Sequence, residues 1–280
     1  MKLNNENAVI YIPDNKEEGY KRTTDLCISA HQDDIEIMSY GPTVKCYQKD
    51  DLWFTGMVVT DGAGSPRTGE YLKYTDEDMK KVRIEEQKAA ALIGGYAAQF
   101  LLGYSSKQVK TPGNEELIEE IKNVIMECAP ERLYTHNLAD KHDTHVAVAL
   151  RVIEAVRRIP KDKRPKEIYS LEVWRSLDWL CDEDKVIFDT SKHPNLAAAL
   201  LGVYDSQIAG GKRYDAAAIS RRLANATFFE SHGVDDIESM NFGLNITELV
   251  NDETIDPKDF IMKYIGRFKS EVEDRLERLS

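Results

Sequence analysis

Short apolar runs alternate with longer segments of helical periodicity through the first two-thirds of this chain, and that alternation limits its fold more than any other feature. Runs rich in β-branched and aromatic residues between turn residues are typical of strands. Such strands are expected at residues 8–12, 25–30, 53–60, 98–102, 132–135, 168–173 and 185–189. Helices are predicted at residues 76–93, 114–128, 143–158, 194–201, 214–229 and 257–279, with another beginning near Pro42. This order indicates an α/β fold, with a Rossmann-like, mostly parallel sheet and helices on both faces.

No linker, internal repeat or low-complexity tract divides the chain. Its 280 residues are enough to bury one large core. We therefore expect a single domain over residues 1–280, with its core at about 22–245. The pattern becomes helical towards the end, which predicts a helical C-terminal elaboration at about 246–280.

The composition excludes several classes of protein. A formal net charge of −12 argues against nonspecific nucleic-acid binding, which needs a basic surface. No run approaches the roughly 20 apolar residues of a membrane helix, and residues 1–7 lack the apolar core of a signal peptide. The four cysteines are scattered and form no CxxC pair, so buried, reduced thiols are expected instead of disulfides or thiolate zinc ligands. These features together predict a cytoplasmic protein.

Three residues with metal-binding side chains, His31, Asp33 and Asp34, directly follow the predicted strand at 25–30. Ligands of open α/β sheets bind at the carboxyl ends of the strands. Imidazole nitrogens and carboxylate oxygens suit Zn²⁺ and similar ions. Of two consecutive carboxylates, one can ligate a metal while the other stays free beside it. The alternative for this segment is a solvated acidic turn.

A second segment, Asp140 to His145, follows the predicted strand at 132–135. His142 and His145 lie three positions apart at the start of a predicted helix, so they share one face. Three protein ligands and a water are the composition of a catalytic zinc site. The two segments are therefore predicted to meet at one metal. The alternative for the second segment is a helix cap and one packed histidine.

Residues 31–36 (HQDDIE) resemble the AHPDDE signature of the PIG-L/LmbE-like zinc-dependent deacetylases, and residues 142–145 (HDTH) resemble their HxDH signature. Arg83 and Glu86 match the R-x-x-E helix of that family, and the resemblance extends from about residue 25 to 242. Gln32 stands where the family usually has proline. Thr144 stands where it usually has an aspartate that orients the first histidine; Asp143, one residue earlier, either partly substitutes for that aspartate or only caps the helix.

The resemblance implies a role for each matching residue. The metal ligands would be His31, Asp34 and His145. The ion would be Zn²⁺, although Fe²⁺ would accept the same ligands. Asp33 would be the general base, His142 would stabilise the oxyanion or protonate the leaving amine, and Arg83 would lie near the substrate.

Other side chains are weighed from their positions alone. Arg67, on the Gly-rich loop 61–69, and Asp140 are further candidate substrate contacts, and solvation of Arg67 is an equal alternative. His136, at a strand end, is predicted to be a hydrogen-bonded structural histidine. Ser206 and Gln207 either reach the pocket rim or cap a helix. Trp174 is predicted to be a core or dimer contact instead of a sugar-stacking surface.

The function implied is a metal-dependent N-deacetylase, a hydrolase of linear amide C–N bonds, acting on an N-acetylglucosamine-like moiety of a small conjugate. Zinc chemistry suits amide hydrolysis because the ion lowers the pKa of a bound water from 15.7 to about 7. One alternative is an amidase for non-sugar amides at the same site. Another is a non-catalytic sugar- or metal-binding protein of the same fold, and a nucleotide-binding Rossmann domain without metal is a third. Homo-oligomerisation stays open.

Overall fold

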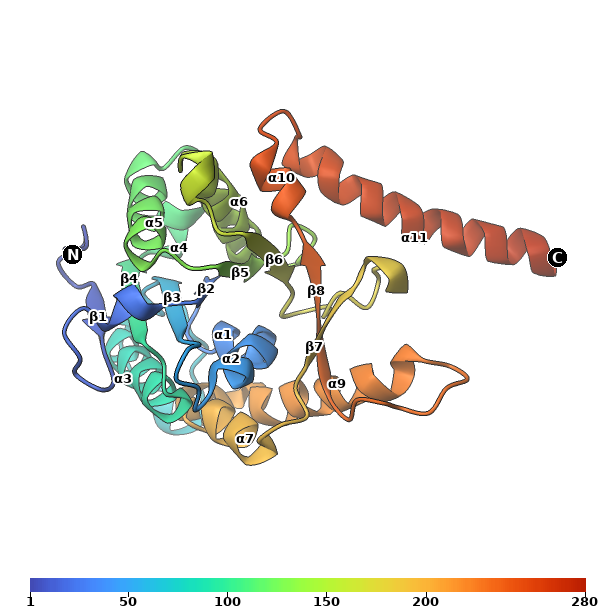
Figure 1. The fold of residues 1–280 in the computed structure, drawn as a ribbon. Helices are drawn as coiled ribbons and strands as arrows, with labels where there is room; N and C mark the ends of the chain where they lie inside the picture. The colour runs from blue at the N-terminus through green and yellow to red at the C-terminus, as the bar shows by residue number, and fades with distance from the viewer.

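The computed structural model describes residues 1–280, in which eight strands form one mixed sheet (Figure 1). Their order across the sheet is β1-β4-β3-β2-β5-β6-β8-β7. The strands are β1 (Val9–Tyr11), β2 (Asp25–Ser29), β3 (Phe54–Thr60), β4 (Ala98–Tyr104), β5 (Arg132–His136), β6 (Glu167–Leu171), β7 (Val186–Asp189) and β8 (Met240–Asn245). The five strands from β4 to β6 in this order run parallel, whereas β1, β8 and β7 pair antiparallel with their neighbours. The predicted Rossmann-like, mostly parallel sheet is confirmed.

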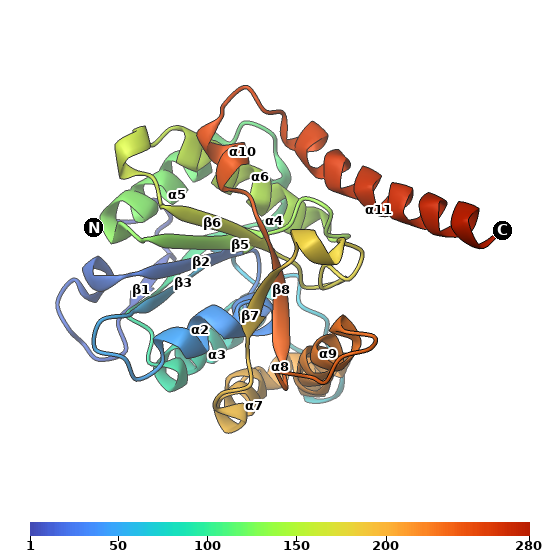
Figure 2. The same cartoon turned by 45° about the vertical axis from the view of Figure 1, so that its right-hand side comes forward.

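Helices cover both faces of the sheet (Figure 2), with α5 and α6 on one face and α2, α3, α7 and α9 on the other. The helices are α1 (Asp34–Met38), α2 (Tyr40–Cys46), α3 (Asp76–Gly94), α4 (Ser106–Lys110), α5 (Glu115–Cys128), α6 (Asp143–Arg157), α7 (Pro194–Gly202), α8 (Asp205–Gln207), α9 (Tyr214–Phe229), α10 (Thr247–Asn251) and α11 (Pro257–Leu279). Because both faces are covered, β2 and β3 are buried along their whole length, and their sequences are accordingly apolar runs instead of alternating ones.

The strand order brings the carboxyl ends of β2 and β5 together at one edge of the sheet. From β2 the chain moves outwards through β3 and β4, and it then crosses back to β5 on the other side of β2. The carboxyl ends of β2 and β5 therefore form the topological switch point, where open α/β sheets bind their ligands. His31 follows β2 and the segment from Asp140 follows β5.

Two sequence predictions about local structure are wrong. No helix was predicted between the strand at 25–30 and Pro42, but a short helix, α1, begins at Asp34 directly after Asp33, whose φ is 88°. Strand β8 was missed because residues 237–245 carry Asn and Gly, which are rare in strands. Gly243 is needed there because a side chain would collide with Phe188 and Leu171.

The cysteines, the character of the helices and the C-terminal segment can also be compared with the sequence predictions. All four cysteines are free and buried, as predicted. None of the helices has both the length and the apolar character that crossing a membrane requires. The C-terminal elaboration is helical in α10 and α11, and α11 extends away from the body in both views (Figures 1 and 2). The single-domain organisation stays a prediction. β1 precedes the expected core at about 22–245 and nevertheless joins the sheet by pairing with β4.

Candidate active site

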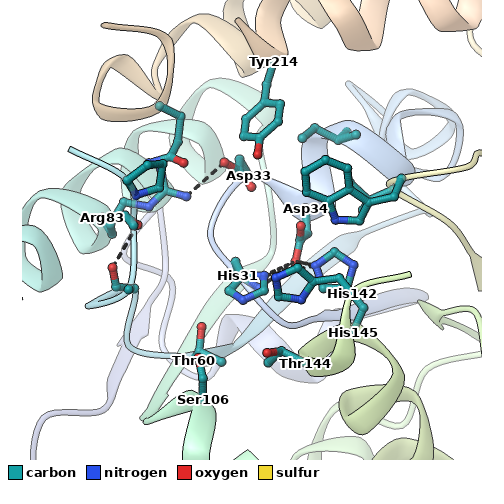
Figure 3. Close-up of a pocket in the computed structure, with 18 of the residues that line it drawn as sticks. His31, Asp33, Asp34, Thr60, Arg83, Ser106, His142, Thr144, His145 and Tyr214 are labelled. Carbon is teal, nitrogen blue, oxygen red and sulfur yellow. Dashed lines mark hydrogen bonds and ion pairs between the residues drawn. The ribbon is translucent and has the colours of Figure 1, made fainter. Parts of the chain in front are cut away.

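A cavity of about 280 Å³ opens at the switch point of the sheet (Figure 3). Both segments singled out in the sequence reach it, although they lie more than a hundred residues apart in the chain. Its lining includes the loop after β2, the N-terminus of α6, and side chains from α3 and α9. The lining residues with polar or aromatic side chains include His31, Asp33, Asp34, Thr60, Arg83, His142, Thr144, His145, Trp174, Gln207 and Tyr214.

Three ligand atoms converge at the floor of the cavity. His31 Nδ1 lies 3.1 Å from His145 Nε2 and 3.2 Å from Asp34 Oδ2, and the last two atoms are 3.4 Å apart. In a tetrahedral zinc site with bonds of about 2.0–2.1 Å, neighbouring ligand atoms are about 3.3–3.4 Å apart. The donor set therefore fits a divalent ion both chemically and in its spacing. Burial alone would raise the pKa of Asp34, but the nearby His145 and His31 hold it well below its usual value.

His142 is brought to the same place from the N-cap of α6. Its ring lies 5.0 Å from that of His31 and 4.6 Å from that of His145, and it can form an all-histidine ligand group with them. Burial and then the neighbouring His145 lower the pKa of His142, so it is neutral at pH 7. Its Nδ1 is buried and has no hydrogen-bond partner. Thr144, at the position of the usual aspartate, is buried and lines the cavity.

His136 has the structural role predicted for it. Its Nε2 accepts a 2.8 Å hydrogen bond from the backbone N–H of Ala30 and lies 3.4 Å from Asp34 Oδ2. Burial and then His145 lower its pKa to about 4, which keeps the ring neutral. His136 ends β5, and its Nε2 accepts the hydrogen bond from the residue that follows β2. It therefore ties the ends of β2 and β5 together behind the ligand atoms.

Asp140 lies behind the cavity instead of in its lining. Its Oδ2 is 3.1 Å from His145 Nδ1 and accepts a hydrogen bond from the backbone of Val173, while its Oδ1 accepts one from the backbone N–H of His142. This position corrects the sequence prediction of a substrate contact. A carboxylate on the far nitrogen of a ligand histidine fixes its tautomer and orientation.

Asp33 is held beside the ligand atoms by an unusual backbone and a buried arginine. Its φ of 88° is uncommon for a residue with a side chain and is found at functional sites. Arg83 Nη2 donates to Asp33 Oδ2 at 3.1 Å and also to the backbone carbonyl of Gln32. The side chain of Gln32 donates to the carbonyl of Thr60, so the loop is anchored without the usual proline. Burial, partly opposed by Arg83, raises the pKa of Asp33 to about 7.

Arg83 itself is only 1% exposed and is fixed from both sides. Its Nη1 donates to Glu86 Oε2 at 2.9 Å, and Glu86 also accepts hydrogen bonds from the backbone and hydroxyl of Ser206. The late segment at α8 is thereby attached to α3, and the neighbouring Gln207 reaches the cavity. Arg83 lines the cavity, but both of its Nη atoms are already bonded to the protein.

Several site residues differ from the sequence prediction. Trp174 was expected in the core or an interface, but it lines the cavity. Tyr214, which was not considered, lines it too (Figure 3). Arg67 lies outside this cavity, where it pairs with Asp76 at 2.5 Å and donates to the Ala63 carbonyl. Aromatic side chains just after β6 and at the start of a helix carry no motif, so only the fold could place them.

Comparisons with known proteins agree with this geometry. The family model described as PIG-L, GlcNAc-PI de-N-acetylase, matches residues 26–156, which contain both motif segments. A probable N-acetyl-α-D-glucosaminyl L-malate deacetylase of Bacillus cereus is 25% identical over 186 residues, which cover 65% of this chain and 82% of that protein. The chain is thus similar to deacetylases of the PIG-L type over the region that holds both motif segments.

Solved structures share the fold at lower identity. The N,N'-diacetylchitobiose deacetylase of Pyrococcus horikoshii superposes with a TM-score of 0.60 at 17% identity, covering 79% of this chain and 83% of that one. The 4-carboxy-2-hydroxymuconate hydratase of Pseudomonas putida superposes with a TM-score of 0.57 at 15% identity, covering 80% and 96%. The same fold therefore carries more than one kind of reaction, and the side chains of the site must decide between them.

Proposed function

We propose that this protein is a metal-dependent hydrolase that removes the N-acetyl group from an N-acetylglucosamine-like moiety of a small conjugate. The observation that carries the proposal is the triangle formed by His31 Nδ1, Asp34 Oδ2 and His145 Nε2, with the carboxylate of Asp33 beside it. The family model and the Bacillus cereus relative support N-deacetylation as the reaction.

The metal would be held by His31, Asp34 and His145, and we propose Zn²⁺, with Fe²⁺ as the alternative ion that accepts these ligands. A divalent ion in this site would polarise the amide carbonyl and lower the pKa of water to about 7. Asp140 keeps the Nδ1 of His145 protonated and its Nε2 free for the ion.

Asp33 is proposed as the general base. It lies in the cavity with Asp34 but is held by Arg83 instead of by a histidine, so its carboxylate is free to accept a proton from water. Burial raises the pKa of Asp33, and a bound cation would lower it again, so the carboxylate form that accepts a proton is present at neutral pH. The proton that Asp33 accepts can then pass to the amine nitrogen as the C–N bond breaks.

His142 is proposed to donate a hydrogen bond to the developing oxyanion. Its lowered pKa makes it a neutral donor at pH 7, and the absence of a carboxylate at position 144 removes the feature that would favour the imidazolium form. A hydrogen bond aimed at the oxyanion stabilises the transition state more than the ground state.

Aromatic and cationic side chains at the cavity suggest what the substrate carries. Trp174 and Tyr214 offer apolar surfaces against which a sugar ring can pack. Lys141 Nζ and Lys212 Nζ lie 5.1 Å and 5.6 Å from the Trp174 ring centre, and Lys110 lines the cavity. Cations gathered at the mouth of a site on a protein of net charge −12 favour a conjugate with an anionic group.

The proposal is tested by metal analysis of the purified protein together with an acetate-release assay. The substrates are N-acetylglucosamine conjugates with neutral or carboxylate-bearing aglycones, and N-acetyl amino acids serve as non-sugar amides. We expect about one metal ion per chain and equal amounts of acetate and free amine from the sugar conjugates. Hydrolysis of the non-sugar amides alone would favour the amidase alternative, and metal-loaded protein that hydrolyses none of them would refute the proposed function.

A further inference from the structure

The C-terminal helix α11 has little contact with the rest of the protein. Only Phe260 and Ile261 of its residues are buried, and both views show the helix extending beyond the body (Figures 1 and 2). The mostly free part, residues 263–279, is roughly 25 Å long; near its start Tyr264 packs partly against the core and Arg267 pairs with Asp184. A helix of this length is marginal in water on its own and gains most of its stability by packing an apolar face.

The free part of α11 carries such an apolar face. Five apolar side chains recur at intervals of three or four residues and so share one stripe: Ile265, Phe268, Val272, Leu276 and Leu279. Four of them are exposed, from 37% at Val272 to 75% at Leu279. Below we call this set the α11 stripe. Ile265 is half-buried, so the uncovered part of the stripe runs from Phe268 to Leu279.

The spacing of the α11 stripe is the same in both directions. Its intervals of three, four, four and three residues are palindromic, with Val272 at the centre. In an antiparallel pair of these helices, Ile265 would therefore face Leu279, Phe268 would face Leu276, and Val272 would face its own copy. A self-complementary surface of this kind is what a two-fold symmetric interface requires.

The charges of the helix favour the same arrangement. Residues 263–269 carry three positive charges and no acid, whereas residues 271–278 carry four acids and two arginines. An antiparallel pair brings the basic half of each helix to the acidic half of the other, with Arg267, which also pairs with Asp184 of its own chain, opposite Glu277; a parallel pair does not. Two like-charge pairs would also lie opposite each other, Lys269 with Arg275 and Glu271 with Glu273. These four residues are already paired within each helix, as Lys269–Glu273 and Arg275–Glu271.

From these features we propose that α11 is a dimerisation helix that pairs antiparallel with α11 of a second copy of this chain, in a two-fold interface centred on Val272. A contact between two helices of this length lies at the low end of stable interfaces, below roughly 1,200 Å² in total. The dimer should therefore be reversible, with dissociation in the micromolar range. A membrane surface is a poorer occupant because charges of both signs flank the α11 stripe, without the strong basic excess that binds lipids.

Cross-linking at the centre of the helix tests the geometry. Val272→Cys places a thiol on the two-fold axis, whereas Ser270→Cys places one on the opposite face of the same helix, and the native cysteines are all buried. With a short bis-maleimide, Val272→Cys should give a covalent dimer at least tenfold faster than Ser270→Cys. Equal rates for the two variants would overturn the antiparallel pairing.

Sedimentation velocity of the full chain tests the association itself. The dimer fraction should rise with concentration, and Leu276→Glu should weaken association at least tenfold while Ser270→Glu leaves it unchanged. A chain that stays monomeric throughout the micromolar range, or an oligomer insensitive to Leu276→Glu, overturns the proposal. If the unmodified chain forms no dimer but binds anionic lipid vesicles, and Leu276→Glu abolishes that binding, the α11 stripe would be a membrane-binding surface instead. Acetate release should be equal in all these variants, because α11 contributes no residue to the cavity.

Discussion

Replacing Asp33 with asparagine separates its proposed proton transfer from every other role it has. The side chain keeps its shape and can still accept a hydrogen bond from Arg83 through its amide oxygen. Asparagine also tolerates the left-handed backbone that Asp33 adopts at φ 88°. The metal ligands are untouched, because the ligand triangle includes His31, Asp34 and His145 but not Asp33.

The expected magnitudes follow from these contacts. Loss of a general base lowers kcat by about 10²–10⁴-fold. Burial raises the pKa of Asp33, so the folded state disfavours its charge, and a neutral asparagine that keeps the hydrogen bond from Arg83 should not lower the stability. Arg83 also retains its ion pair with Glu86 and its bond to the Gln32 carbonyl, so the variant should fold with a Tm no lower than that of the native protein.

The assay follows acetate release over a range of pH with metal content measured on the same samples. The native enzyme should lose kcat/KM as the pH falls through the pKa of Asp33, which lies near 7 without metal and lower with a cation nearby, because only the carboxylate form accepts a proton. Asp33→Asn should retain its metal and KM but lack this acid limb. Asp143→Asn is the matched control, since that neighbouring acid is exposed and outside the cavity. Wild-type turnover in Asp33→Asn with metal bound would show that another group is the base.

Three further substitutions test the groups around the site and the sheet. Asp140→Asn should weaken metal affinity about 10- to 100-fold, measured by competition with a chelator, because the ligand histidine loses its orienting carboxylate. Thr144→Asp should raise the pKa of His142, followed by NMR of its ring protons, whereas Thr144→Asn should not; equal shifts in the two variants would contradict a charge effect. Asp25→Ala should cost about 3–5 kcal/mol at pH 7, because it leaves Arg132 without its buried partner. Burial alone would raise the pKa of Asp25, but its hydrogen bonds with Arg132 and Thr24 lower it. This stability is therefore present above about pH 4 and is lost as the pH falls through the folded pKa. In urea unfolding, the difference in unfolding free energy between the native protein and Asp25→Ala should be smaller at pH 3 than at pH 7.

Much of the fold could be predicted because local sequence and tertiary packing agree. The apolar positions of α5, such as Leu117, Ile121 and Val124, recur at helical spacing and are all buried against the sheet. α9 and α11 begin and end where the sequence predicts. Strand β8 was missed because its stability comes from pairing with β6 and β7 across the sheet, and such long-range pairing leaves little trace in a six-residue segment.

For the candidate site, sequence could place side chains at strand ends but not aim them. His31 and His145 were predicted to meet because both follow parallel strands that end at one edge, and their nitrogens do lie 3.1 Å apart. Whether a nearby carboxylate faces the cavity or the back of a histidine depends on backbone angles that spacing does not encode. That is why Asp140 was misassigned, and why Trp174 was placed in the core although it lines the cavity.

The fold alone does not select a deacetylase, since a hydratase shares it. The two adjacent carboxylates of the site favour hydrolysis because their surroundings differ. Burial raises the pKa of Asp33 to about 7, with only Arg83 opposing it, whereas His145 and His31 overcome the same burial and hold the pKa of Asp34 far below its usual value. One carboxylate is therefore able to take up and release a proton near neutral pH, and its neighbour is a permanent anion suited to hold a cation. When the surroundings of two neighbouring acids separate their pKa values, one acid can transfer protons while the other stays charged and stabilises a cation. A metal-assisted hydrolysis needs both roles within one small cavity, and this loop supplies them from consecutive residues because the unusual φ at Asp33 turns the chain between the two.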